Sequence, residues 1–346
     1  MKSGKTLTQL AAEITRQAES KKDFVAPTTA LRLRDDGSTL DLHMKGAFAV
    51  NDLGHEQIGD RVGIPRAYYD RMRHHAPSLL ASNVNHWFAE KAERRMIRTV
   101  DNRVRAFLSE RYRPLDNYDL AEAVLPKIQE MDCHVESCEL TERRLYVKAV
   151  TTKVSGEVRR GDVVQAGIVV SNSEVGCGSL RVEPMVFRLI CLNGAIAPDS
   201  GIRKYHVGRG EGGNDENVSE FFSDRTRQAD DRAFFLKVRD VVSAVMTKES
   251  FDRICNRMRE AAGDKIEGDP VKVCEVAQKR WGLTDDERGG VLKHLVGGGD
   301  LTRYGLLNAV TRMSQDVGDY DRATDLERLG GSILELPRSE WAAVSK

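Results

Sequence analysis

The sequence has no long hydrophobic run. None of its apolar stretches approaches the roughly 18 consecutive apolar residues that a membrane-spanning helix needs. Residues 1–22 also lack the continuous apolar segment of a secretion signal, and Leu7, Leu10 and Ile14 instead have the spacing of an amphipathic helix. These absences argue against a membrane partner and predict a cytoplasmic protein.

The six cysteines show no paired spacing. They are scattered from Cys133 to Cys274 without a CxxC pair, which favours reduced thiols over a disulfide framework. Cys133 and His134 with Cys138 make half a metal site, and no second pair follows at zinc-finger spacing. The chain also lacks the GxSxG motif of serine hydrolases and the HExxH motif of zinc proteases. It has no GxxxxGK[ST] phosphate-binding loop, and no GxGxxG dinucleotide-binding motif directly after a predicted strand. We therefore expect no metal, no cofactor and no catalytic activity.

The chain has no net charge, because 53 Lys and Arg residues balance 53 Asp and Glu residues. The charges are nevertheless unevenly distributed. Residues 88–116 carry eight basic groups against five acids, and residues 142–160 carry six against two, whereas residues 211–231 carry seven acids against two arginines. This distribution favours an anionic ligand bound by the N-terminal part of the chain. The alternative is that the charges form separate solvated faces.

Two β-branched runs are the clearest structural signal. Residues 163–170 and 180–190 flank a polar, glycine-containing turn, which predicts a β-hairpin. Further strands are expected at 94–100, 104–110, 132–139 and 145–151, a short hairpin within 28–50, and helices within 56–93 and at 117–131. Helical periodicity then continues at 219–246, 248–262, 270–281, 285–294 and 304–317. The predicted fold class is α+β: a mainly antiparallel sheet with packed helices in residues 1–208, followed by a mostly helical region in residues 209–346.

Basic and aromatic residues alternate in one part of the N-terminal region. Arg103 and Arg105 lie two residues apart in a predicted strand, so they share one face, and the sequence Arg111-Tyr112-Arg113 follows where the strand ends. Guanidinium groups neutralise phosphates, and aromatic rings stack on unpaired bases. This pattern suits single-stranded nucleic acid, although a sheet edge decorated with arginine for solubility would have the same spacing.

Two further segments carry candidate binding residues. Arg188 ends the second strand of the central hairpin, just before Cys191 and Asn193, so it is expected at a strand end. The glycine-flanked loop of residues 201–210 contains the remaining candidates, which are Arg203, Lys204, Tyr205 and Arg209. Such a loop can order around a nucleic-acid backbone, and an ordinary surface loop is the alternative.

Three runs, at residues 105–117, 167–196 and 301–334, resemble a known family. They are similar to the phage- and plasmid-like proteins of domain-of-unknown-function family nine-three-two, and the resemblance spans the chain from about residue 28 to its end. The family pattern of Arg followed by Cys-x-Asn stands here as Arg188, Cys191 and Asn193. The resemblance implies a role in the DNA metabolism of mobile elements and supplies no catalytic residues. The expected topology also resembles that of phage single-strand annealing proteins of the RecT and Red-beta group, by analogy of fold alone.

These observations predict a protein that binds single-stranded DNA and that anneals single strands during recombination. Strand edges that lack a partner within the chain predict a homo-oligomer, in which neighbouring basic faces form one groove. The alternative is a protein-interaction factor that acts on a host defence or replication protein. The acidic stretch of residues 211–231 and the long helical region motivate this alternative.

Overall fold

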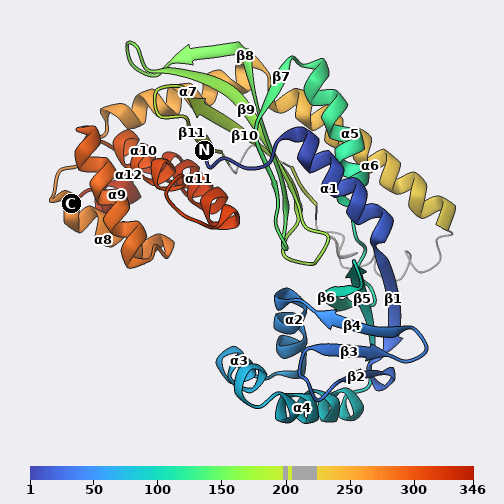
Figure 1. Cartoon of the computed structure of the whole chain (residues 1–346). Helices are drawn as coiled ribbons and strands as arrows, with labels where there is room; N and C mark the ends of the chain where they lie inside the picture. Colours follow the sequence, from blue (N-terminus) through green and yellow to red (C-terminus); the bar gives the residue numbers. More distant parts are fainter. Residues whose placement is uncertain (198–201, 205–223) are drawn as a thin grey trace.

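The computed structural model describes residues 1–197, 202–204 and 224–346. Its strands form two sheets, one toward each end of the molecule (Figure 1). The first sheet has the strand order β1-β5-β6-β4-β3-β2, and the second has the order β11-β10-β9-β8-β7, with β12 also paired to β10. Among the described strands, every pairing is antiparallel except that of β4 with β6. The predicted α+β class with a mainly antiparallel sheet is therefore confirmed.

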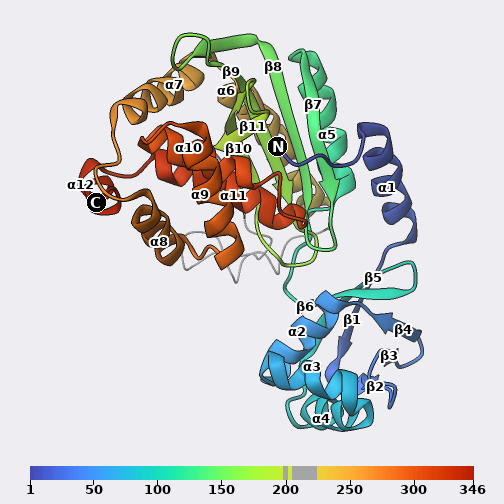
Figure 2. The same cartoon turned by 60° about the vertical axis from the view of Figure 1, so that its left-hand side comes forward.

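The first sheet uses the N-terminal third of the chain. Its strands are β1 (Lys22–Pro27), β2 (Leu31–Leu33), β3 (Thr39–Leu42), β4 (Gly46–Val50), β5 (Arg94–Val100) and β6 (Arg103–Ser109), with a 3-10 turn, η1 (Thr28–Ala30), after β1. Three helices lie beside it, α2 (Asp52–Val62), α3 (Arg66–His75) and α4 (Pro77–Glu90) (Figure 2). Leu31, Leu33 and Leu40 alternate with less buried positions along their strands and pack in one core with Phe88 of α4. The sheet therefore has one helix-covered face.

The second sheet is built around the hairpin that the sequence predicts most clearly. Its strands are β7 (Cys133–Leu140), β8 (Leu145–Glu157), β9 (Val163–Asn172), β10 (Leu180–Arg188), β11 (Asn193–Ile196) and β12 (Ile202–Lys204). In the register of the hairpin, Arg181 lies opposite Ser171 and Arg188 lies opposite Val164. The short strands β11 and β12 pair with the two ends of β10. The two ends of β10 thus carry the two segments that the sequence singles out.

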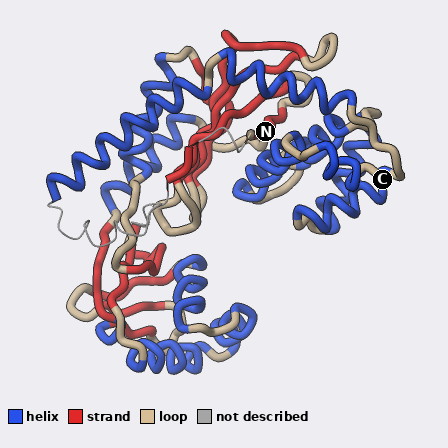
Figure 3. The backbone as a smooth tube through the Cα atoms, turned by 180° about the vertical axis from the view of Figure 1, so that it is seen from behind, coloured by secondary structure: helices blue, strands red, loops and turns tan. Residues whose placement is uncertain are grey.

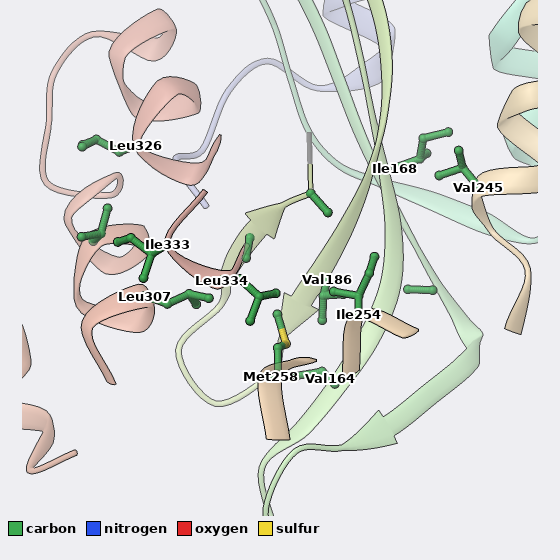
Figure 4. Close-up of a cluster of buried hydrophobic side chains, with 14 of the residues drawn as sticks. Val164, Ile168, Val186, Val245, Ile254, Met258, Leu307, Leu326, Ile333 and Leu334 are labelled. Atoms are coloured by element: carbon green, nitrogen blue, oxygen red, sulfur yellow. The ribbon is translucent and has the colours of Figure 1, made fainter. Parts of the chain in front are cut away.

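Helices pack on both faces of the second sheet (Figure 3). The helices outside the first-sheet region are α1 (Leu7–Ser20), α5 (Asn117–Glu130), α6 (Asp224–Val245), α7 (Lys248–Gly263), α8 (Pro270–Trp281), α9 (Asp285–Gly298), α10 (Arg303–Met313), α11 (Tyr320–Leu334) and α12 (Arg338–Val344). Of these, α8, α9 and α12 pack against other helices. One face of the sheet is apolar, and Figure 4 shows Ile168 and Val186 near side chains of α6 and α7, such as Val245 and Ile254. No helix within the described ranges has both the length and the apolar character that a bilayer span requires.

The opposite face of the second sheet meets α11 through buried charges. Lys148 of β8 pairs with Glu327 at 2.6 Å, and Arg328 pairs with Glu183 of β10 at 2.8 Å. Lys148, Glu327 and Glu183 are all fully buried. A helix from the C-terminal region is therefore joined to the sheet by specific ion pairs as well as by apolar contact.

One large core includes residues from Leu10 to Val344 and combines side chains of the second sheet with side chains of the helices that follow it. The domain boundary expected between residues 208 and 209 lies outside the described residues, and this core continues on both sides of it. A separate core lies under the first sheet.

Candidate functional site

The end of β10 carries a tightly bonded arginine. Arg188 donates two hydrogen bonds to Asp162, the residue just before β9, with N–O distances of 2.7 and 2.9 Å. Tyr304 of α10 donates its hydroxyl proton to the same carboxylate at 3.0 Å, and its ring centroid lies 5.6 Å from the guanidinium carbon of Arg188. Burial alone would lower the pKa of Arg188, but the Asp162 carboxylate raises it, so Arg188 stays charged. The pair fixes the strand end to α10.

The turn from β10 to β11 is held in place by α10 and the residues after it. Nη1 of Arg188 lies 3.1 Å from Sγ of Cys191. The side-chain amide of Gln315 donates hydrogen bonds to the carbonyls of Cys191 and Leu192 at 2.9 and 3.1 Å. Leu192 has a φ of 50°, in the left-handed region, as a tight turn requires. Asn193 is 2% exposed and donates to Thr311 of α10. The Arg–Cys–Asn pattern of the sequence therefore builds one ordered turn.

A pocket of about 400 Å³ opens beside this turn; we call it the basic pocket. It lies where the turn meets the C-terminal half of α9 and one side of α10. It is lined by Arg188, Cys191, Lys293, His294, Leu295, Gly297, Gly298, Asp300, Gly305, Asn308, Ala309 and Arg312. Four of these side chains are basic and one is a carboxylate.

The carboxylates near the basic pocket are already engaged. Asp300 pairs with Arg159 at 2.9 Å and accepts a hydrogen bond from Thr302, and Asp316 pairs with His294 at 2.6 Å. Arg312 donates to the side-chain oxygen of Gln315, which is neutral. Among the described residues, neither Lys293 nor Arg312 has a carboxylate within ion-pair distance. Two cations thus line the pocket without a compensating charge, which favours an anionic ligand.

The apolar side chains of the turn lie outside the core. Leu189, Ile190 and Leu192 are 39%, 61% and 56% exposed. They flank Cys191, which lines the basic pocket. A ligand with an anionic group and an apolar part would therefore find both kinds of contact within a few residues.

The structure corrects the assignment of Arg105 and Tyr112 as ligand contacts. Arg105 is 9% exposed and donates to Glu174 and Gln17, and Tyr112 is 6% exposed and donates its hydroxyl proton to the carbonyl of Ser173. Ala106 pairs with Arg98 and Val104 pairs with Thr99, so a bulge leaves Arg105 of β6 without a partner in β5. Both side chains join the first sheet to the loop after β9, so neither ring nor guanidinium is open to a base or a phosphate.

The other candidates do not form one site. Arg103 and Arg111 are exposed, and Arg113 pairs with Asp230 of α6 at 3.6 Å. The backbone of Arg203 and Lys204 lies in β12, opposite Arg181 and Leu180 of β10. Arg181 precedes Arg188 by seven residues in β10, which is about 24 Å along a strand. Tyr205 and Arg209 lie outside the described residues.

Sequence reasoning missed Lys293, His294 and Arg312. They lie on α9 and α10, more than 100 residues after Arg188, and no charge run or motif marks them. Only the packing of α10 against the strand end brings them to Arg188. Within the described residues, no group of three or more His, Cys, Asp or Glu side chains is placed to hold a metal ion.

A comparison with family models gives one match. The model of a domain of unknown function (DUF932) matches residues 106–329, more than half of the chain, and confirms the family resemblance drawn from the sequence. The matched region contains the second sheet, the ordered turn and the basic pocket. Searches of curated proteins and of solved structures found no match.

Proposed function

Since this chain belongs to the DUF932 family, whose description names no activity, we propose a function from the site: the chain binds single-stranded DNA, with phosphates in the basic pocket. The observation that carries the proposal is the pair of uncompensated cations, Lys293 and Arg312, in one pocket. Phosphate contacts supply most of the sequence-independent affinity of a protein for nucleic acid. The zero net charge of the chain means that such local charge, rather than an overall field, would attract the strand.

The exposed apolar side chains of the β10–β11 turn favour single-stranded DNA over a small inorganic anion as the ligand of the basic pocket. In a single strand the bases are unpaired, so sugars and bases are free to contact apolar side chains while the phosphates remain bound. Leu189, Ile190 and Leu192 supply such side chains next to the basic pocket. The proposal includes annealing of complementary strands by a homo-oligomer in mobile-element DNA metabolism, because pockets on successive copies would extend one binding path.

Fluorescence anisotropy with a labelled single-stranded oligonucleotide tests the proposal. We expect Lys293→Glu to weaken binding and to lower the slope of log affinity against log salt by about 0.7 for each phosphate that the variant no longer neutralises. Lys272→Glu is the matched control, because Lys272 is an exposed lysine of α8 outside the pocket and the charge change is the same. Equal affinity and slope for the two variants would refute the pocket as the phosphate site.

A second candidate is the protein-interaction factor, and one observation favours it. A hollow of about 570 Å³ between α5 and α6 is lined in part by Phe235 and Leu236, and Leu236 is 58% exposed. An apolar hollow with charged residues around it suits a protein segment. Capture of the same host protein before and after nuclease treatment, abolished by Leu236→Asp, would support this candidate over DNA binding.

A further inference from the structure

Helices α2 and α3 are joined by a very short turn. Only three residues, Gly63, Ile64 and Pro65, separate them. Gly63 has a φ of 73° and ends α2 in the left-handed conformation, and the amide of Ile64 donates to the carbonyl of Gly59 at 3.0 Å. Pro65 then precedes the first residue of α3. Two helices joined by a three-residue turn that contains glycine have the connection of a helix-turn-helix.

The two helices pack closely. A Cβ atom placed on Gly59 of α2 would lie 2.9 Å from the ring of Tyr69 of α3, closer than atoms approach without displacement. The hydroxyl of Tyr69 also lies 2.9 Å from Nδ1 of His55, and both side chains are buried. Met72, one turn further along α3, is buried as well. The orientation of α3 on α2 is therefore fixed by packing and not by the turn alone.

The opposite side of α3 is exposed and basic. Tyr68 is 48% exposed, and Arg71, His74 and His75 are also exposed. Tyr68, Arg71 and His75 follow at intervals of three and four residues, so they share one face of the helix. Within the described residues, none of these four side chains has a hydrogen-bonding or ion-pair partner. The one acid of α3, Asp70, is paired with Arg66 at 2.7 Å.

We propose that this helix-turn-helix binds duplex DNA, with α3 in the major groove. The exposed face of α3 carries the guanidinium of Arg71, the imidazoles of His74 and His75 and the hydroxyl of Tyr68 without a free acid, which complements a groove lined by phosphates and base edges. An α-helix fits the major groove of B-form DNA in width, and Arg71 has the planar fork that contacts guanine or phosphate. Figure 2 shows α3 on the first-sheet end of the molecule, away from the β10–β11 turn. The inference is therefore independent of the proposed single-strand site.

The experiment uses the full chain and a labelled DNA hairpin duplex in an anisotropy titration. We expect Arg71→Glu to weaken duplex binding on the order of tenfold or more. The control Lys45→Glu makes the same kind of charge reversal at an exposed residue in the turn between β3 and β4, and it should bind the duplex as the parent chain does. Circular dichroism and thermal melting of both variants check that folding is unchanged, as expected for exposed side chains.

Two further measurements separate this proposal from others. An RNA hairpin of matching sequence should bind more weakly than DNA, because the major groove of A-form RNA is too narrow for a helix. Lys293→Glu should leave duplex binding unchanged while it weakens single-strand binding. Absence of duplex binding, equal affinity for the RNA hairpin, or an Arg71→Glu variant that binds like Lys45→Glu would each overturn the proposal.

Discussion

The buried ion pair of Lys148 and Glu327 joins β8 to α11, and its contribution to the free energy of unfolding can be measured directly. Both side chains have zero exposure, and the Nζ–Oε2 distance is 2.6 Å. The ring centroid of Tyr320 lies 4.6 Å from the same ammonium group. The substitution Glu327→Gln keeps the shape of the side chain and removes its charge, so it leaves a buried lysine without a counter-charge.

We expect Glu327→Gln to lower the free energy of unfolding by about 3–5 kcal/mol, because breaking one side of a buried pair leaves an uncompensated charge. The double variant Lys148→Met with Glu327→Leu removes both charges at similar volume, and it should cost far less than the single variant. Urea denaturation, followed by circular dichroism, measures both values at neutral pH.

The loss of unfolding free energy in Glu327→Gln should also depend on pH. Burial lowers the pKa of Lys148, and Glu327 opposes that shift. Without Glu327 the folded-state pKa of Lys148 falls further below its unfolded value, so the unfolded chain binds more protons in the window between the two. The stability of Glu327→Gln should therefore rise toward that of the parent chain as the pH approaches the ordinary lysine pKa, about 10.4. A loss below about 1 kcal/mol at neutral pH, or a double variant as unstable as the single one, would refute this reasoning.

Three other outcomes follow from the packing. Burial lowers the pKa of His55 to about 4, below its unfolded value of about 6.5. The free energy of unfolding should therefore fall by about 3 kcal/mol as the pH drops from above 6.5 to 4. Urea titrations at several pH values should show that His55→Gln lacks this dependence. Arg188→Lys keeps the charge but cannot make the two-pronged contact with Asp162, so its unfolding free energy should fall by about 1–3 kcal/mol in chemical denaturation. Leu307→Ala removes a side chain that is 1% exposed, and calorimetry should show a loss of about 2–5 kcal/mol, whereas an unchanged melting temperature would contradict the core position.

Local signals predicted many elements well. The helix expected at 270–281 coincides with α8, because Pro270 and Gly282 mark its two ends in the sequence. The strand expected at 94–100 coincides with β5. The strand β1 was not predicted, because its sequence is short, begins with charges and ends in proline, and its pairing with β5 joins residues more than 60 positions apart.

Of the binding residues predicted from the sequence and described in the structure, only Arg188 lines the basic pocket. Arg188 was identified from its place at a strand end, and the structure places it beside the basic pocket. Arg105 and Tyr112 have the spacing of a binding surface, yet the loop after β9 covers them, and no local pattern records that contact. Lys293 and Arg312 reach the pocket from helices far along the chain, so their role depends on tertiary packing alone.

The most direct test of single-strand binding at the basic pocket uses ultraviolet light to crosslink a single-stranded DNA oligonucleotide to the full chain. Mass spectrometry then identifies the attached peptides. We expect crosslinks on the β10–β11 turn at residues 189–192 and on the α9 and α10 residues that line the basic pocket. Their disappearance in Lys293→Glu, together with their retention in Lys272→Glu, would connect the crosslinked strand to the pocket. Absence of crosslinks, or crosslinks confined to other parts of the chain, would contradict the proposal that this pocket holds the phosphates of a single strand.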